Sequence, residues 1–257
     1  MNNGERFEKL VGIVRRLRSD DGCPWDREQT HDSLLPHFLE EAYEVMEAVD
    51  NENWKALSEE LGDVLLHVLF QSDIAEQESE FKLQDVIDQI NDKLVRRHPH
   101  VFGNKKAEGA FHAKQNWEAA KQAEKKRDSR LDGVPVTLPA LIRAQRLQQK
   151  AAYVGFDWEE TDQVWNKVHE EMEELKNAES TGIKKHMEEE VGDLFFALVN
   201  LCRFLDISAE DALRKGNQKF TRRFQAVEKE LKRRGKNLEE TNLTEMDEIW
   251  NSQKKSV

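Results

Sequence analysis

The sequence predicts an all-α protein built from two tandem helical repeats. Apolar residues recur at three- and four-residue spacing in nearly every segment, which is typical of amphipathic helices. Only 12 Gly and 5 Pro occur among 257 residues, so few breakers interrupt the helices. One long pattern also occurs twice, which indicates two copies of the same unit.

The helices are expected wherever an apolar stripe persists over three turns or more. The clearest stripes cover residues 34–49, 83–94 and 138–147. Similar spacing elsewhere predicts about ten helices in all and no clear strand. The 38% hydrophobic and 35% charged content suits helices with one apolar and one charged face.

The repeat aligns residues 40–66 with residues 170–196 at a shift of 130 and without a gap. A second block, residues 91–100, returns at 217–226 with a shift of 126. Trp117 with Lys121 is echoed by Trp250 with Lys254. Gly and Pro gather in the stretch DSRLDGVPVTLP, so we predict one domain over residues 1–132 and a second over residues 133–257.

The charge balance limits the classes of partner. Acidic residues outnumber basic ones by 51 to 39, which gives a net charge of −12 and disfavours nucleic acid as the main partner. Cys23 and Cys202 are the only cysteines and are expected to be reduced thiols. No apolar run has the length of a signal segment or a membrane span, so we expect a cytoplasmic protein.

Four acidic residues of the second half are spaced to converge. Glu171 and Glu174 share one helix face, and Glu190 and Asp193 share a face of the next helix. Sixteen residues separate Glu174 from Glu190, which suits two antiparallel neighbours. Because crowded carboxylates repel one another, we expect a hard divalent cation among them, and Mg²⁺ prefers carboxylate and water oxygens.

The same four acids recur in the first half as Glu41, Glu44, Glu60 and Asp63. A solvated acidic face is the simplest alternative, yet each Gly–Asp pair leads into a long apolar run, where such a face is not expected. A di-iron site is disfavoured because it needs Glu-x-x-His, whereas His67 follows Asp63 by four residues.

Basic residues complete the pattern in each half. Lys219, Arg222 and Arg223 follow the second acidic group, and Lys93, Arg96 and Arg97 occupy the matching positions after the first. Either set alone is typical of a solvated helix face. Beside a carboxylate metal site, it indicates capture of a polyphosphate. Trp250 and Trp117 either stack on a base or close the core.

The order E-x-x-E, then E-x-x-D, then K-x-x-x-R resembles the all-α nucleoside triphosphate pyrophosphohydrolases, and most closely the MazG family in its tandem form. The segments that carry the resemblance span the whole chain: GCPWDREQTHDSL, LEEAYEVMEAV, EELGDVLLHVLF, RRHPHVF, LPALIRAQRLQQKAAYVGFDW and EEEVGDLFFALVNL. The implied fold is a four-to-five-helix bundle in each half.

The resemblance implies cleavage of NTPs and dNTPs between the α and β phosphates, dependence on Mg²⁺ with Mn²⁺ as a substitute, and a homodimer. It assigns catalysis and metal binding to Glu171, Glu174, Glu190 and Asp193, and nucleotide binding to Lys219, Arg223, Trp250 and Lys254. It assigns a second site to Glu41, Glu44, Glu60, Asp63, Lys93 and Arg97. Either Glu171 or Glu174 is the expected general base.

The second half is the expected main catalytic half. Pro99 should end the helix after Arg97, whereas the helix after Arg223 should continue through Leu231. Both halves keep four acids, so two working sites stay open. The alternatives to an enzyme are a module that binds nucleotides without hydrolysing them and, less favoured, a purely structural scaffold.

Overall fold

The computed structural model describes residues 1–104, 108–125 and 128–253. Two compact units divide the chain, Met1–Lys121 and Gln122–Val257. The described residues form α-helices and one short 3₁₀ helix and include no strand, so the all-α prediction is confirmed. No helix among them is both long enough and apolar enough to cross a membrane.

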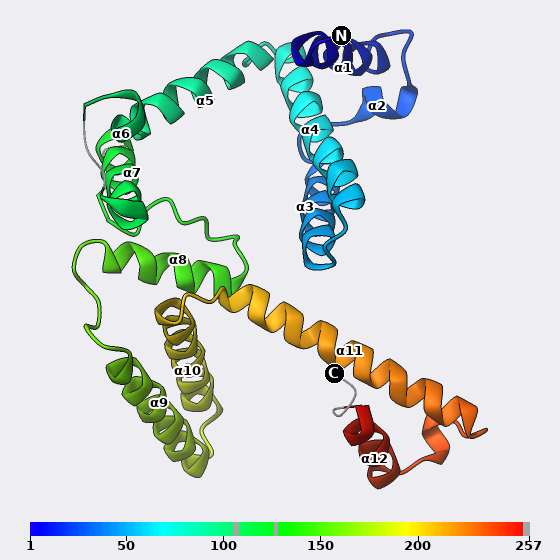
Figure 1. Cartoon of the computed structure of the whole chain (residues 1–257), viewed down its shortest axis with the longest axis vertical. Coiled ribbons are helices and arrows are strands. Elements are labelled where there is room, and N and C mark those ends of the chain that lie inside the picture. The colour runs from blue at the N-terminus through cyan, green and yellow to red at the C-terminus, as the bar shows by residue number, and fades with distance from the viewer. Residues whose placement is uncertain (105–107, 126–127, 254–257) are drawn as a thin grey trace. The chain divides into compact units, whose positions relative to one another are not determined.

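The described residues of the first unit form the helices α1 to α6 and most of α7 (Figure 1). Their bounds are α1 (Asn3–Leu17), α2 (Pro24–Glu28), α3 (Leu35–Asp50), α4 (Trp54–Gln77), α5 (Leu83–Arg97), α6 (Pro99–Phe102) and α7 (Gly109–Lys125). α3 and α4 lie side by side, and α1 packs on α4. Val11 and Val14 of α1 meet Leu69, Phe70 and other apolar residues there in one buried cluster.

The second unit begins within the last turn of α7. Its elements are α8 (Ala140–Ala152), α9 (Thr161–Thr181), α10 (Lys184–Phe204), α11 (Ala209–Arg233), η1 (Leu238–Glu240) and α12 (Leu243–Gln253). α9 and α10 form the most extensive helix pair, and α8 packs on α10 (Figure 1). Val164 and Val168 of α9 are buried against Ala197 and Leu201 of α10.

The two helix pairs repeat each other down to the turn that joins them. Gly182 follows α9 with a left-handed φ of +69°, and Glu52 follows α3 with a φ of +51°. A shift of 130 residues relates these two positions, as it relates the acidic residues on either side. The structure therefore repeats the reversal that brings the acidic faces together.

Pro99 has the effect that the sequence predicts. α5 ends at Arg97, His98 caps it, and Pro99 begins the short helix α6. α11 has no such break and continues to Arg233. The two copies thus differ in the helix that carries the basic residues, because proline removes a backbone donor and clashes with the preceding turn.

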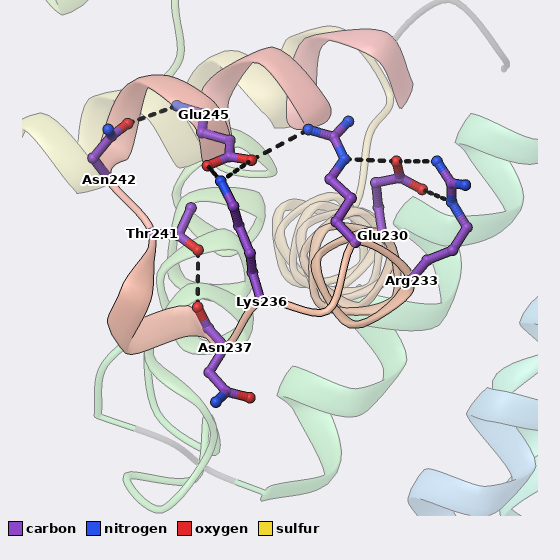
Figure 2. Close-up of polar contacts among 8 residues, drawn as sticks. Glu230, Arg233, Lys236, Asn237, Thr241, Asn242 and Glu245 are labelled. Carbon is purple, nitrogen blue, oxygen red and sulfur yellow. Dashed lines mark hydrogen bonds and ion pairs between the residues drawn. The ribbon is translucent and has the colours of Figure 1, made fainter.

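Ion pairs fix the turn between α11 and α12 (Figure 2). Glu230 accepts hydrogen bonds from Arg233 at 2.7 Å and from Arg234 at 2.8 Å, while Lys236 donates to Glu245 at 2.8 Å. The hydrogen bonds from Arg233 and Arg234 lower the pKa of Glu230 to about 2. This network holds α12 against α11, where Ile249 is buried with Val227 and Leu231.

Each unit also has an ion pair on its long central helix, on α4 in the first unit and on α10 in the second. Arg18, which is 4% exposed, places its Nε 2.9 Å from the Asp73 carboxylate on α4. On α10, Arg203 donates from Nη1 to Asp157 at 2.8 Å. The shift of 130 residues places Arg203 at the position of Asp73, so the charge on the long helix is inverted between the copies.

The segment predicted as a linker has no helix over residues 128–139, and the predicted boundary after residue 132 lies inside it. Lys150 of α8 is buried and donates to the backbone oxygens of Arg130 and Asp132, each at 3.1 Å. These bonds hold this segment, including Leu131, against α8.

Candidate functional site

The acidic residues of the second unit meet between α9 and α10. Glu171, Glu174 and Glu190 each place a carboxylate oxygen within 4.8 Å of the others. Asp193 is one turn further along α10, outside this close group, and borders a cavity that Glu171 also lines. Three of the four predicted acids therefore converge directly, and the fourth faces the same cavity as Glu171.

Glu171 is the most confined member of this cluster, with 4% of its surface exposed. Its Oε1 lies 2.8 Å from Nζ of Lys167, one turn earlier on α9. Its Oε2 is buried and has no hydrogen-bond partner. A buried carboxylate oxygen without a partner is costly, and a cation in the cluster would satisfy it. The donor set consists of hard oxygen ligands, which fits Mg²⁺.

The electrostatics of the cluster also favour binding of a divalent cation. Burial raises the pKa of Glu174, and the negative charges of Glu171 and Glu190 raise it further. Hydrogen bonds to Glu170 and Glu171 raise the pKa of Lys167, which therefore stays charged. One ammonium group faces several carboxylates, so negative charge is left over for a divalent cation.

The first unit carries a similar cluster in which the aspartate takes part. Glu41, Glu60 and Asp63 place carboxylate oxygens within 4.8 Å of one another. Glu44 joins them through side-chain hydrogen bonds to Glu41 and Glu60. Burial raises the pKa of Glu41, as does the nearby charge of Asp63. The predicted acids thus lie together in the first copy, whereas in the second copy Asp193 is outside the close group.

His67 belongs to the packing and not to the first acidic cluster. Its ring is 9% exposed and meets the ring of Phe38 edge-on, with 5.8 Å between centroids. Burial lowers the pKa of His67, followed in effect by the charge of His37. Among the described residues, the two candidate metal clusters consist of carboxylates alone, which agrees with the argument against a di-iron site.

The basic residues meet the tryptophans, as the repeat suggests. The guanidinium carbon of Arg223 lies 5.8 Å from the ring centre of Trp250, and that of Arg97 lies 5.2 Å from Trp117. Trp250 also packs against the buried cluster of α11 and α12, so it contributes to the core. Nε of Arg223 is buried without a hydrogen-bond partner.

In the second unit, the described part of the chain shows no direct contact between the basic and the acidic residues of the predicted site. Among the described residues, no hydrogen bond or ion pair connects Lys219 or Arg223 to the acids of α9 and α10. Lys93 and Arg97 occupy the matching turns of α5. Lys254 lies outside the described residues. Joint action of acids and bases therefore stays a prediction.

A cavity of about 800 Å³ lies beside the second acidic cluster. Its wall includes the charged residues Lys167, Glu171 and Asp193 and the aromatic residues Phe156 and Trp158. The sequence analysis did not single out Lys167, although its spacing of four residues from Glu171 is a recognisable signal. It also did not single out the cavity, whose walls come from α8, α9, α10 and the segment between α8 and α9.

Residues 29–102 and 159–228 match the family model described as the MazG nucleotide pyrophosphohydrolase domain. The chain belongs to the MazG family. The two matched segments contain both acidic sets and the basic residues Lys93, Arg97, Lys219 and Arg223. The MazG segments do not include α8 or the aromatic residues Phe156 and Trp158.

Relatives within the MazG family match nearly the whole chain. A Thermotoga maritima protein named nucleoside triphosphate pyrophosphohydrolase/pyrophosphatase MazG is 45% identical over 98% of this chain and 96% of its own length. An Escherichia coli K12 protein named nucleoside triphosphate pyrophosphohydrolase is 43% identical over 97% of each chain. The uncharacterized protein YabN of Bacillus subtilis is 47% identical over 97% of this chain and 52% of its own length.

Proposed function

We propose that this protein hydrolyses nucleoside triphosphates between the α and β phosphates and releases a nucleoside monophosphate and pyrophosphate. Membership of the MazG family and the names of its near full-length relatives support the reaction. The unpartnered Oε2 of Glu171, buried within a three-carboxylate cluster, is the structural observation that carries the proposal. Ribo- and deoxyribonucleotides are both proposed substrates.

The acidic cluster of the second unit is the proposed metal site. Glu171, Glu174, Glu190 and Asp193 would hold Mg²⁺, with Mn²⁺ as a substitute. The bound ion would supply positive charge for the phosphates and lower the pKa of a bound water. Lys167 occupies one oxygen of Glu171 through an ion pair at 2.8 Å, so Glu174 is the better candidate for the base that accepts a proton from water.

Positive charge for the departing pyrophosphate would come from Lys219, Arg223 and Lys254, with Trp250 beside them. Arg223 fits this role because its Nε has no partner and its guanidinium is held on the Trp250 ring.

We propose a homodimer in the cytoplasm, with nucleic acid disfavoured as the main partner by the charge of −12. Leu213, Phe220 and Phe224 are exposed on α11, which supports association through this helix. The two free cysteines support a reducing compartment. Sedimentation at twice the 30.0 kDa chain mass is the expected result, and a monomer at micromolar concentration would exclude the dimer.

The reaction is tested by changing single acids without changing their size. Glu174→Gln and Asp193→Asn should each lower pyrophosphate release from ATP or dGTP by at least about 100-fold, because even groups behind a metal ligand contribute about 10–100-fold. Glu173→Gln, the neighbouring and exposed position on α9, is the matched control and should keep full turnover.

Undiminished pyrophosphate release in both variants would overturn the mechanism. If the wild-type protein binds ATP by calorimetry but releases no pyrophosphate with Mg²⁺, the result instead supports a nucleotide-binding module. Helical content measured by circular dichroism should be the same in all variants, since the substituted acids are on the surface of α9 and α10.

A further inference from the structure

A network of charges connects α11 to α12 at the turn between them. Arg234 donates from Nε to Glu230 at 2.8 Å and from Nη1 to Glu245 at 3.3 Å, so one guanidinium bridges an acid of α11 and an acid of α12. Nζ of Lys236 also lies 2.8 Å from the Glu245 carboxylate (Figure 2). These four residues form what we call the clasp.

The clasp is a stronger link than an isolated surface ion pair. The side chains of Glu230 and Glu245 are 25% and 20% exposed. Charges that form a network with good geometry contribute where single exposed pairs contribute little. A hydrogen bond from Lys236 lowers the pKa of Glu245, and the pKa of Glu230 is lowered to about 2. The acids of the clasp are therefore ionised at neutral pH, and salt is the condition that weakens it.

α12 depends on its contacts with α11 because it is short. It has 11 residues, and an isolated helix of fewer than about 12–15 residues is marginal in water. Ile249 of α12 is buried against Val227 and Leu231 of α11. Glu245 precedes Ile249 by one helical turn, so both lie on the same face of α12. The clasp therefore fixes the first turn of α12, and Ile249 fixes the next.

α12 also carries the ring on which Arg223 lies. The guanidinium carbon of Arg223 is 5.8 Å from the ring centre of Trp250, and Phe220 packs on the same ring with 5.3 Å between centroids. Nε of Arg223 is buried and has no hydrogen-bond partner, so the cation–π contact with Trp250 matters more for its orientation. A displacement of α12 would move the surface that supports this guanidinium.

The two units reach the same arginine–tryptophan contact through different connections. Arg97 and Trp117 are 20 residues apart in the first unit, whereas Arg223 and Trp250 are 27 residues apart in the second. When the tryptophans are aligned, the three clasp residues that follow α11 or begin α12 fall on Val101, Gly103 and His112. The clasp is therefore specific to the second unit, where a longer connection has to return the tryptophan to the arginine.

We propose that Arg234 and Glu245 are positioning residues for nucleotide binding, because the clasp holds α12 so that Trp250 supports the guanidinium of Arg223. The inference rests on the proposed function, in which Arg223 and Trp250 belong to the nucleotide site. It adds that salt weakens nucleotide binding in part by opening the clasp, beyond its direct screening of the phosphates.

The first test observes the ring of Trp250 without any ligand. When 5-fluorotryptophan replaces all six tryptophans, Trp250→Phe and Trp117→Phe identify two of the fluorine NMR resonances. Glu245→Ala should shift or broaden the Trp250 resonance and leave the Trp117 resonance in place. Glu248→Ala removes an exposed acid from the same helix and, as the matched control, should move neither. An unmoved Trp250 resonance in Glu245→Ala would overturn the inference.

The second test measures binding without turnover, with α,β-methylene-ATP and Mg²⁺ in calorimetry. Glu245→Ala should weaken binding about 5-fold, which is the order of one weakened cation–π contact. In a Trp250→Ala background the same change should cost less than about twofold, since the residue through which the clasp acts is gone. Equal losses in the two backgrounds would overturn the role of Trp250 as the link.

Arg234→Gln breaks the clasp from its other partner and should reproduce the loss seen in Glu245→Ala. The double variant should lose no more than either single variant, because both residues belong to one network. At 1 M NaCl, where the Debye length falls to about 3 Å, wild type and Glu245→Ala should bind the nucleotide analogue equally. Fully additive losses, or a difference that persists at 1 M NaCl, would contradict a shared electrostatic role.

The outcomes separate this inference from the proposed reaction. Mn²⁺ binding to the acidic clusters should be the same in Glu245→Ala as in the wild type, which shows that the second unit is folded. If the wild type binds the analogue but releases no pyrophosphate from ATP, the reaction is overturned and the role of the clasp stands. If the wild type releases pyrophosphate and Glu245→Ala binds the analogue as tightly as the wild type does, the clasp is overturned and the reaction stands.

Discussion

Glu171 is a carboxylate that is buried and yet needs its negative charge to be balanced. It is buried beside Glu174 and Glu190, yet only one of its oxygens is paired, with Lys167, and the other is unpaired. Burial of an ionised carboxylate is tolerated only when its charge is balanced. Lys167 supplies one balancing charge, and the metal in the proposed mechanism supplies the rest.

Glu174 allows this balance to be tested through pH. Its pKa in the folded protein is raised above the ordinary value of 4.5, by burial first and then by Glu171 and Glu190. The folded protein therefore holds a proton that the unfolded chain has lost, and stability falls as pH rises from 4.5 through the folded pKa. In EDTA at pH 7, Glu174→Gln should therefore raise the melting temperature.

This gain in melting temperature should disappear below about pH 4, where the Glu174 carboxyl of the wild type is protonated in both the folded and the unfolded protein. With excess Mg²⁺ at pH 7, the wild type should instead have the higher melting temperature, because only the wild type offers the ion the full set of carboxylates. Glu173→Gln serves as the control and should shift the melting temperature little, since it removes only an exposed pair with Lys176. A gain for Glu174→Gln that is independent of pH would contradict the assignment.

The residues that the sequence identified are those in the repeated pattern. Glu171, Glu174 and Glu190 could be found because helical spacing and duplication both mark them. Gln148 could not, since an amide in a helix gives no sign in the sequence of whether its oxygen finds a partner. In the folded unit its Nε2 donates to the backbone oxygen of Phe196 on α10, while its Oε1 has no partner.

At the scale of helices, the turn after α9 sets the geometry of the acidic cluster. Gly182 has a left-handed φ of +69°, which L residues with a Cβ adopt at a cost. Gly182→Ala should therefore lower the free energy of unfolding by about 1 kcal/mol, the strain exceeding the entropy gained in the unfolded chain. A Cβ there would meet no atom within 4 Å, so steric contact adds nothing.

Glu52→Ala is the control at the matching turn of the first unit. Glu52 already has a Cβ in the left-handed region, so this substitution should change the free energy of unfolding by less than about 0.5 kcal/mol. Urea unfolding of both variants checks the comparison. Equal losses at the two turns would show that the left-handed strain is not the cause.

Helix boundaries were predictable where a single residue determines them. Pro99 ends α5 at Arg97, and the absence of proline lets α11 run to Arg233. The packing of α8 was harder to predict, because it lies outside the repeated block and its contacts depend on the whole second unit. The cavity therefore became visible only in the structure.

At the scale of the whole molecule, each unit contains one acidic cluster. We expect two Mn²⁺ sites per chain when bound and free Mn²⁺ are counted by electron paramagnetic resonance, one for each cluster. Glu60→Gln should remove one site and leave pyrophosphate release within about twofold, since Pro99 breaks the helix that carries the basic residues of the first unit. Glu190→Gln should remove the other site together with turnover.

A loss of turnover in Glu60→Gln equal to that in Glu190→Gln would show that both units catalyse. The tandem all-α architecture and the position of both clusters were predictable, because periodicity and duplication are properties of the sequence. The position of Lys219 and Arg223 relative to the acids was not predictable, since α11 carries these two residues and spacing within one helix does not fix how α11 meets α9 and α10.

The inverted ion pairs have a consequence for how a chain with two similar halves folds correctly. If α1 packed against α10 in place of α4, Arg18 would face Arg203 instead of Asp73. This wrong pairing brings like charges together, whereas both native pairings bring opposite charges together. The chain thus distinguishes its own two copies electrostatically, which disfavours exchange of helices between them as the protein emerges from the ribosome.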